Sequence, residues 1–97
     1  MITEIAIFQA VPGKEDALEQ GIQRGIEVGK RAPGCHSIAA HRCIEDPARF
    51  LLVVEWESLE AHTEGFRKSP LFAEYRSHIN GLFVDSPTVH HYQALNS

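Results

Sequence analysis

The period of the apolar positions changes along the chain and divides it into strands and helices. Residues 2–11 (ITEIAIFQAV) and 49–57 (RFLLVVEWE) are rich in β-branched and aromatic residues, which is typical of strands. In residues 14–31 apolar side chains recur every four positions from Leu18 to Ile26, which indicates an amphipathic helix. The chain therefore combines strand and helix patterns within its first 31 residues.

Turn and capping residues mark the ends of the remaining elements. Pro-Gly pairs follow the first strand and the first helix, and Ser58 and Ser69-Pro70 are helix start signals. The elements predicted are strands at 2–11, 35–44, 49–57 and 88–95, and helices at 14–31, 59–67 and 70–80. The order β-α-β-β-α-α-β predicts one α+β domain over residues 1–97. We expect a ferredoxin-like split β-α-β fold, with a four-stranded antiparallel sheet covered by helices on one face.

The first helix carries a second stripe of small residues, which are Ala17, Gly21, Gly25 and Gly29. Each glycine inside a helix costs about 1 kcal/mol relative to alanine, so a compensating contact is expected. We interpret the stripe as a site of close approach, where the helix backbone lies almost directly on its sheet. A ligand that approaches the backbone here is the alternative.

The third strand is apolar on both faces. Phe50, Leu52 and Val54 point one way with Trp56, while the residues between them point the other way and are also apolar. The first strand has the same pattern. Because the helices of the chain can cover only one face, we expect a second copy to cover the other, sheet against sheet. The sequence therefore predicts a homodimer.

Composition and charge exclude several classes of protein. The net charge is −4 and basic residues are scattered, so we expect no nucleic-acid partner. The longest strongly apolar run, Phe50 to Val54, is too short to span a membrane, and the N-terminal segment lacks a signal peptide pattern. We expect a cytoplasmic protein. Cys35 and Cys43 fall on one predicted strand roughly 26 Å apart, which is too far for a disulfide.

The six histidines do not show a metal-binding spacing. His90 and His91 are adjacent on a strand and so point to opposite faces, as do His36 and His41. His41 and Cys43 share a face, but no further ligand is close in sequence. We expect solvent-facing or hydrogen-bonded histidines and no metal. Nucleophile elbows, phosphate-binding loops and paired-carboxylate signatures are also missing from the sequence.

Four motifs in order resemble the antibiotic biosynthesis monooxygenase (ABM) family of dimeric α+β barrels. They are VPGKEDALE, APGC, EDPARFLLVVEWESLEAH and SPLFAEYR, and together they cover nearly the whole chain. The resemblance implies a tight dimer with a pocket between each sheet and the helices after the third strand. It also implies oxidation of a small aromatic phenol or quinol by O₂, without metal, flavin or haem. An electron-rich phenolate can reduce O₂ directly once the protein binds its rings and excludes water.

The residues that suit this chemistry lie between the third strand and the last helix. Trp56 matches the tryptophan of the family's W-x-S motif and could stack on a planar substrate. His62 or His78 could take the phenolic proton, and Arg76 could hold the oxyanion. The predicted catalytic residues are Trp56, His62, Arg76 and His78, and the predicted substrate-binding residues are Phe66, Phe72 and Tyr75. Each could instead be an ordinary core or surface residue.

Two other functions stay open. The haem-degrading branch of the family uses a first-strand asparagine, for which Gln9 is the nearest substitute, and a histidine on the last helix, whose place Arg76 fills. His78 is two residues further on and faces elsewhere, so this branch fits less well. The other alternative is a dimer without enzymatic activity that binds a small hydrophobic molecule, or a stress-related module.

Overall fold

Four strands and three helical segments follow one another in the predicted order. The computed structural model describes residues 1–96 of the chain. The strands are β1 (Ile2–Gln9), β2 (Cys35–Arg42), β3 (Arg49–Trp56) and β4 (Thr88–Tyr92). The helical segments are α1 (Glu15–Gly29), the π-helical turn η1 (Ala61–Phe66) and α2 (Pro70–Ser77).

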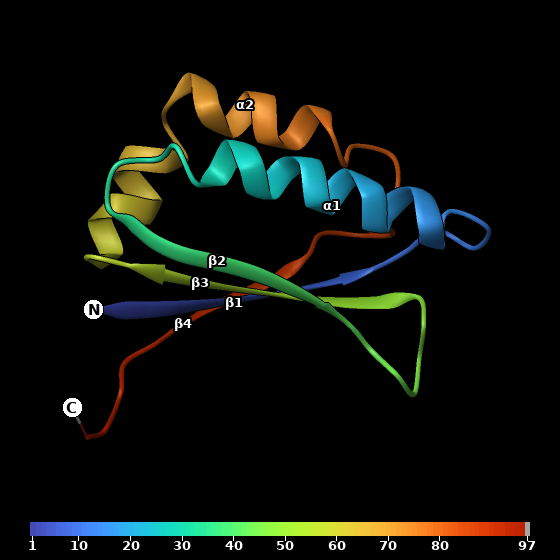
Figure 1. Ribbon diagram of the computed structural model, residues 1–97, viewed down its shortest axis with the longest axis horizontal. Coiled ribbons are helices and arrows are strands. Elements are labelled where there is room, and N and C mark those ends of the chain that lie inside the picture. The colour runs from blue at the N-terminus through green and yellow to red at the C-terminus, as the bar shows by residue number, and fades with distance from the viewer. Residues whose placement is uncertain (97) are drawn as a thin grey trace.

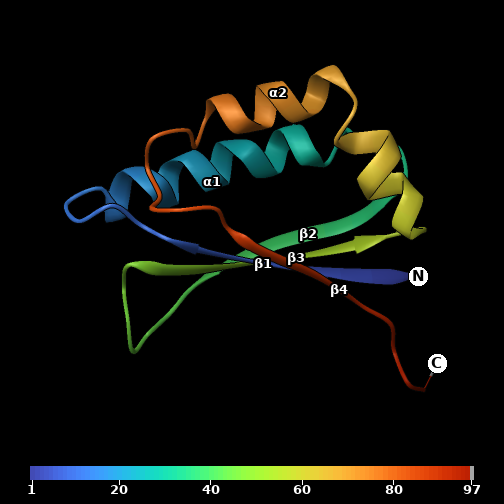
Figure 2. The same cartoon turned by 180° about the vertical axis from the view of Figure 1, so that it is seen from behind.

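The strands form one antiparallel sheet in the order β2-β3-β1-β4. The last strand therefore pairs with the first, and β1 and β3 occupy the centre. Both helices and η1 lie on one side of the sheet, and nothing from residues 1–96 covers the other side (Figures 1 and 2). This arrangement confirms the predicted α+β ferredoxin-like fold. The dimer that would complete a barrel stays a prediction.

Alternation along the central strands separates a covered face from an open face. Ala6, Phe8, Leu52 and Val54 point toward the helices and are at most 3% exposed. Their neighbours point the other way and are only half-buried by the sheet itself. We call this second surface the open face, and its centre consists of two cross-strand pairs, Ile5 with Val53 and Ile7 with Leu51.

The glycine stripe of α1 explains how closely the two helices approach. A Cβ atom on Gly21 would clash with the carbonyl oxygen of His78, and one on Gly25 would lie 2.9 Å from the ring of Tyr75. These two glycines therefore face α2 and the turn after it, which corrects the expectation that the stripe rests on the sheet. Only Gly29 meets a strand residue, the side chain of Ile38.

Strand β4 is shorter than predicted because its partner strand, β1, ends near the same point. Strand β4 stops at Tyr92, which pairs with Thr3 near the start of β1, so the predicted extension to residue 95 has no neighbour to bond.

The Ser58 hydroxyl accepts a hydrogen bond from the backbone N–H of Ala61, as expected of an N-cap. The Ser69 hydroxyl instead donates to the carbonyl of Phe66, so its predicted capping bond is not made.

Both cysteines are free, but Cys43 lies outside the strand that was predicted to hold it. Cys35 opens β2 and Cys43 follows its end, and both thiols are free. Among the described residues, the helices are all too short or too polar to cross a membrane.

Candidate functional site

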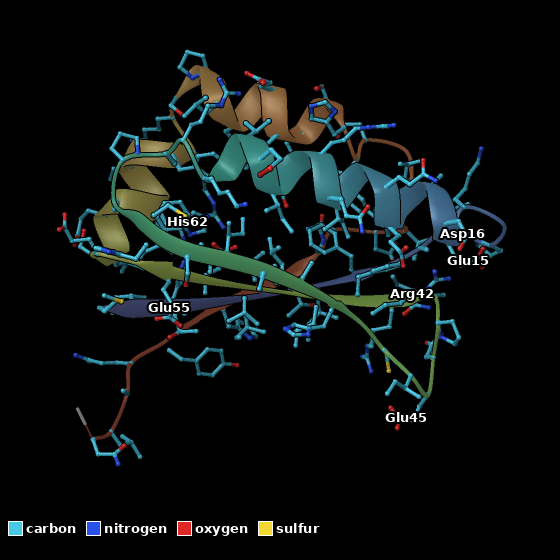
Figure 3. The ribbon with its side chains drawn as sticks, in the orientation of Figure 1. Glu15, Asp16, Arg42, Glu45, Glu55 and His62 are labelled. Carbon is cyan, nitrogen blue, oxygen red and sulfur yellow. The ribbon has the colours of Figure 1, made fainter. Side chains whose placement is uncertain are left out.

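A cavity of about 330 Å³ lies between the covered face of the sheet and the helices. Its walls are mostly apolar and aromatic, and they come from all four strands, α1, η1, α2 and the segment before β4. Four acidic or basic side chains reach this apolar space, namely Glu4, His62, Arg67 and Arg76, and the lining also includes the polar residues Tyr75 and Ser86. Figure 3 shows His62 between η1 and the sheet. The cavity is large enough for a small aromatic ligand.

Glu4 is a buried carboxyl group in the floor of this cavity. It is two residues from Ala6 and four from Phe8 in β1, so the strand period places it on the same covered face. It is 6% exposed, and its Oε1 accepts a hydrogen bond of 2.8 Å from the indole N–H of Trp56. Burial raises the pKa of Glu4, while the Trp56 bond and the charge of Arg67 lower it. The site therefore favours a proton on this carboxyl group more than water does.

His62 connects the carboxyl group to an edge strand. Its Nε2 lies 3.4 Å from Glu4 Oε1, and its Nδ1 lies 2.8 Å from Nε2 of His91 on β4. Burial, followed by the charges of Arg67 and His91, lowers the pKa of His62 to about 4. The imidazole is therefore neutral at neutral pH, with one ring nitrogen as donor and the other as acceptor.

Aromatic rings form the wall around this polar group. The indole of Trp56 stacks on the imidazole of His62 with ring centroids 5.0 Å apart and planes 14° apart. Phe66 contacts both of these rings, and it also meets Phe72 and Tyr75 edge to face. The stack covers one face of the indole, so a ligand can meet Trp56 only at its remaining surface.

Arg76 brings a positive charge to the same cavity. Its guanidinium lies over the rings of Phe72 and Phe83, at 5.8 Å and 5.7 Å from their centroids. Its Nε donates to the side chain of Asn80 at 3.2 Å. Aromatic contact on two sides limits the movement of the guanidinium, and this suits a group that holds an anion in place.

Comparison with known proteins assigns the chain to a family. The sequence profile of the family described as antibiotic biosynthesis monooxygenase matches residues 1–77. The chain belongs to the antibiotic biosynthesis monooxygenase (ABM) family. A relative, the uncharacterized protein YczJ of Bacillus subtilis (strain 168), is 32% identical over 93 residues, which are 96% of this chain and 98% of that protein.

Solved structures share the fold over nearly the whole chain. A Bordetella bronchiseptica protein that bears the same family name is 41% identical, with a TM-score of 0.91 over 97% of this chain and 96% of its own. Rv0793 from Mycobacterium tuberculosis has a TM-score of 0.82 at 23% identity over 99% and 96% of the two chains, which shows a shared fold.

The ABM cavity gathers six of the seven residues that the sequence predicts for the site. They are Trp56, His62, Phe66, Phe72, Tyr75 and Arg76. His78 does not line it, because it lies beyond the end of α2, where its backbone carbonyl faces α1. Gln9, the substitute considered for the haem branch, is also outside the cavity and donates to Asp46.

Sequence reasoning missed the two partners of His62. Glu4 could have been found, since an acidic residue at a core-facing position of an apolar strand is a departure from the pattern. His91 had no comparable signal. The alternation of a strand puts His90 and His91 on opposite faces, but nothing in the sequence says which of these faces meets the helices.

Proposed function

We propose that this ABM-family protein is a cofactor-independent monooxygenase that oxidises a small phenol or quinol-type aromatic with O₂. The observation that carries the proposal is the apolar cavity whose polar groups include an acid–base pair, Glu4 and His62, and two cations, Arg67 and Arg76. A cofactor-independent oxidation of this kind needs a dry aromatic cage, a proton acceptor and a counter-ion for the phenolate.

In this mechanism the protein binds and ionises the substrate, and the substrate itself reduces O₂. The aromatic wall around Phe66 and Phe72 holds the rings, and the Glu4–His62 pair accepts the phenolic proton. Arg76 stabilises the phenolate that results. One oxygen atom of O₂ bonds to a ring carbon as the C–H bond of that carbon breaks, and this oxygen and the phenolate oxygen become the two carbonyls of a quinone. The other oxygen atom leaves as water with the ring hydrogen and the phenolic proton. His78 has no part in this scheme.

We also propose that the active form is a homodimer in the cytoplasm. The open face exposes apolar pairs of the two central strands, and a second sheet packed on them would remove this surface from water. The two free cysteines suit a reducing compartment.

Oxygen uptake with a panel of phenols tests the proposal. The panel consists of hydroquinone, naphthohydroquinone and a hydroxyanthrone, and heat-denatured protein corrects for spontaneous oxidation. We expect Arg76→Ala to lower kcat/KM about 100-fold, the usual effect of removing one group that stabilises an oxyanion. Arg24→Ala, on the exposed side of α1, is the matched control. Equal rates for the two variants would exclude the role of Arg76, and uptake no faster than with denatured protein would exclude the activity on this panel.

One observation favours the second candidate, a dimer that binds a hydrophobic molecule without turnover. Both ring nitrogens of His62 already have partners, and its pKa of about 4 makes it a weak base. Quenching of the fluorescence of Trp56 by the same phenols under nitrogen measures binding alone. Saturable quenching with no oxygen uptake would support the binder.

A further inference from the structure

Three titratable side chains form a continuous row from the cavity to the edge of the sheet. Glu4 and His91 are direct neighbours in the pairing of β1 with β4, and His62 lies over both from η1. The row starts at a 6% exposed carboxyl group and ends at a half-buried imidazole on an edge strand. In the described sheet only β4 offers Glu4 a titratable neighbour, because the residue that β3 pairs with Glu4 is the apolar Val54.

We infer that Glu4, His62 and His91 form a proton relay that carries the proton of a bound phenol from the cavity to solvent at β4. The inference rests on the proposed function only in taking a phenol as the ligand. Oxidation by O₂ is not part of it.

The transfer conserves protons and needs no other reactant. The phenolic O–H bond breaks and its proton passes to the Glu4 carboxylate. Glu4 passes a proton to Nε2 of His62, which gives its own Nδ1 proton to Nε2 of His91. His91 then releases its Nδ1 proton to water. One proton enters, one leaves, and the reverse sequence reprotonates the ligand when it departs.

The surrounding charges favour passage of the proton over storage. Burial lowers the pKa of His91, and the charges of Arg67 and His90 lower it further. The charge of Arg67 also lowers the pKa of His62 and opposes the rise that burial causes in the pKa of Glu4. The other charged or titratable neighbours are Arg76 in the cavity wall and the groups whose pKa the charge of Glu4 helps to raise, Tyr75 and Cys35. The two arginines repel an excess proton and attract the phenolate, so both drive the proton outward.

A purely structural role for the row is the alternative. In that case Glu4 would serve only as an acceptor for the indole of Trp56, and His91 only as a hydrogen-bond partner that orients His62. Replacing His91 would then change stability or affinity. It would not slow the ionisation of a bound ligand, so an added soluble base would have no lost rate to restore.

Stopped-flow binding of 4-nitrophenol to the full chain separates the two roles, because the phenolate absorbs visible light and the phenol does not. The solution is mildly acidic, so that the free ligand is mostly neutral, and a pH indicator follows proton release. We expect wild type to form phenolate and release one proton per ligand. His91→Ala should slow phenolate formation about 100-fold, and added imidazole should restore the rate. His41→Ala, which removes an exposed imidazole from β2 at the opposite edge of the sheet, should behave as wild type.

The outcomes are distinct from those of the oxygen-uptake experiment. An unchanged rate in His91→Ala, a slow rate that imidazole fails to restore, or no phenolate in the wild-type protein would each overturn the relay. Circular dichroism of His91→Ala identifies a folding defect, and Glu4→Gln is then the second variant. Glu4→Gln keeps an acceptor for Trp56 and should abolish the proton release. A protein that passes these tests and consumes no oxygen keeps the relay and loses the proposed oxidation.

Discussion

Acid should destabilise the fold through His62, and the size of the effect follows from its surroundings. The folded protein lowers the pKa of His62 from 6.5 to about 4, chiefly because the imidazole is buried. The neutral ring is therefore favoured in the folded state relative to the unfolded state. The stability that results is fully present above about pH 6.5 and is lost as the pH falls through about 4. It amounts to about 3 kcal/mol at most.

Glu4 contributes with the opposite sign in an overlapping range. Burial raises its pKa, so its contribution is present below the pKa of the unfolded chain and is lost as the pH rises through the folded value. The pH dependence of wild type alone therefore mixes two opposing effects. A comparison with His62→Gln isolates one of them, because the variant keeps Glu4 and replaces the imidazole with a side chain that does not titrate.

The measurement is urea unfolding at a fixed protomer concentration, followed by the fluorescence of Trp56, the single tryptophan of the chain. The difference in free energy of unfolding between wild type and His62→Gln should shrink by about 3 kcal/mol between neutral pH and about pH 4. His90→Gln, on the open face, is the control and should track wild type throughout. A difference that stays constant within about 1 kcal/mol would refute the claim that burial of the imidazole controls its protonation.

Three further substitutions test other contacts. Gly25→Ala should lower the free energy of unfolding by about 1–3 kcal/mol, since its methyl group would press on the ring of Tyr75; thermal unfolding without any loss would contradict the close helix contact. Glu4→Leu should cost about 1–3 kcal/mol more than Glu4→Gln, because it leaves the buried indole N–H of Trp56 without an acceptor; urea midpoints compare the two. Val53→Asp places a charge on the open face and should shift the sedimentation coefficient from that of a dimer to that of a monomer. A wild-type protein that sediments as a monomer would refute the proposed dimer.

The balance between Glu4 and His62 also limits how the site can work. Burial raises the pKa of Glu4 and lowers that of His62, so both shifts oppose a buried ion pair between them, which desolvation would penalise. A ligand that brings its own negative charge beside Arg76 changes that balance. The phenol proposed as substrate would change it in this way when it loses its proton.

Local patterns were sufficient for the architecture. Alternation in residues 49–57 identified β3 and showed that both its faces are apolar, and capping residues located η1 and α2 within a few positions. These features depend on neighbours within one or two turns of the chain, so they are visible without tertiary information. The motifs around Trp56 and His62 added the family, and with the family came most of the cavity wall.

What the sequence by itself determined is which residues form each element and which of them face a common side. Only the tertiary structure decided which elements meet. The glycines of α1 turned out to contact α2, and Glu4 met His62 and His91 across segments separated by most of the chain. The physical reason is that strand register and helix docking depend on the total burial of the assembled core, which no local pattern records. The protonation of the site follows from that burial, and so the chemistry became visible only once the chain was folded.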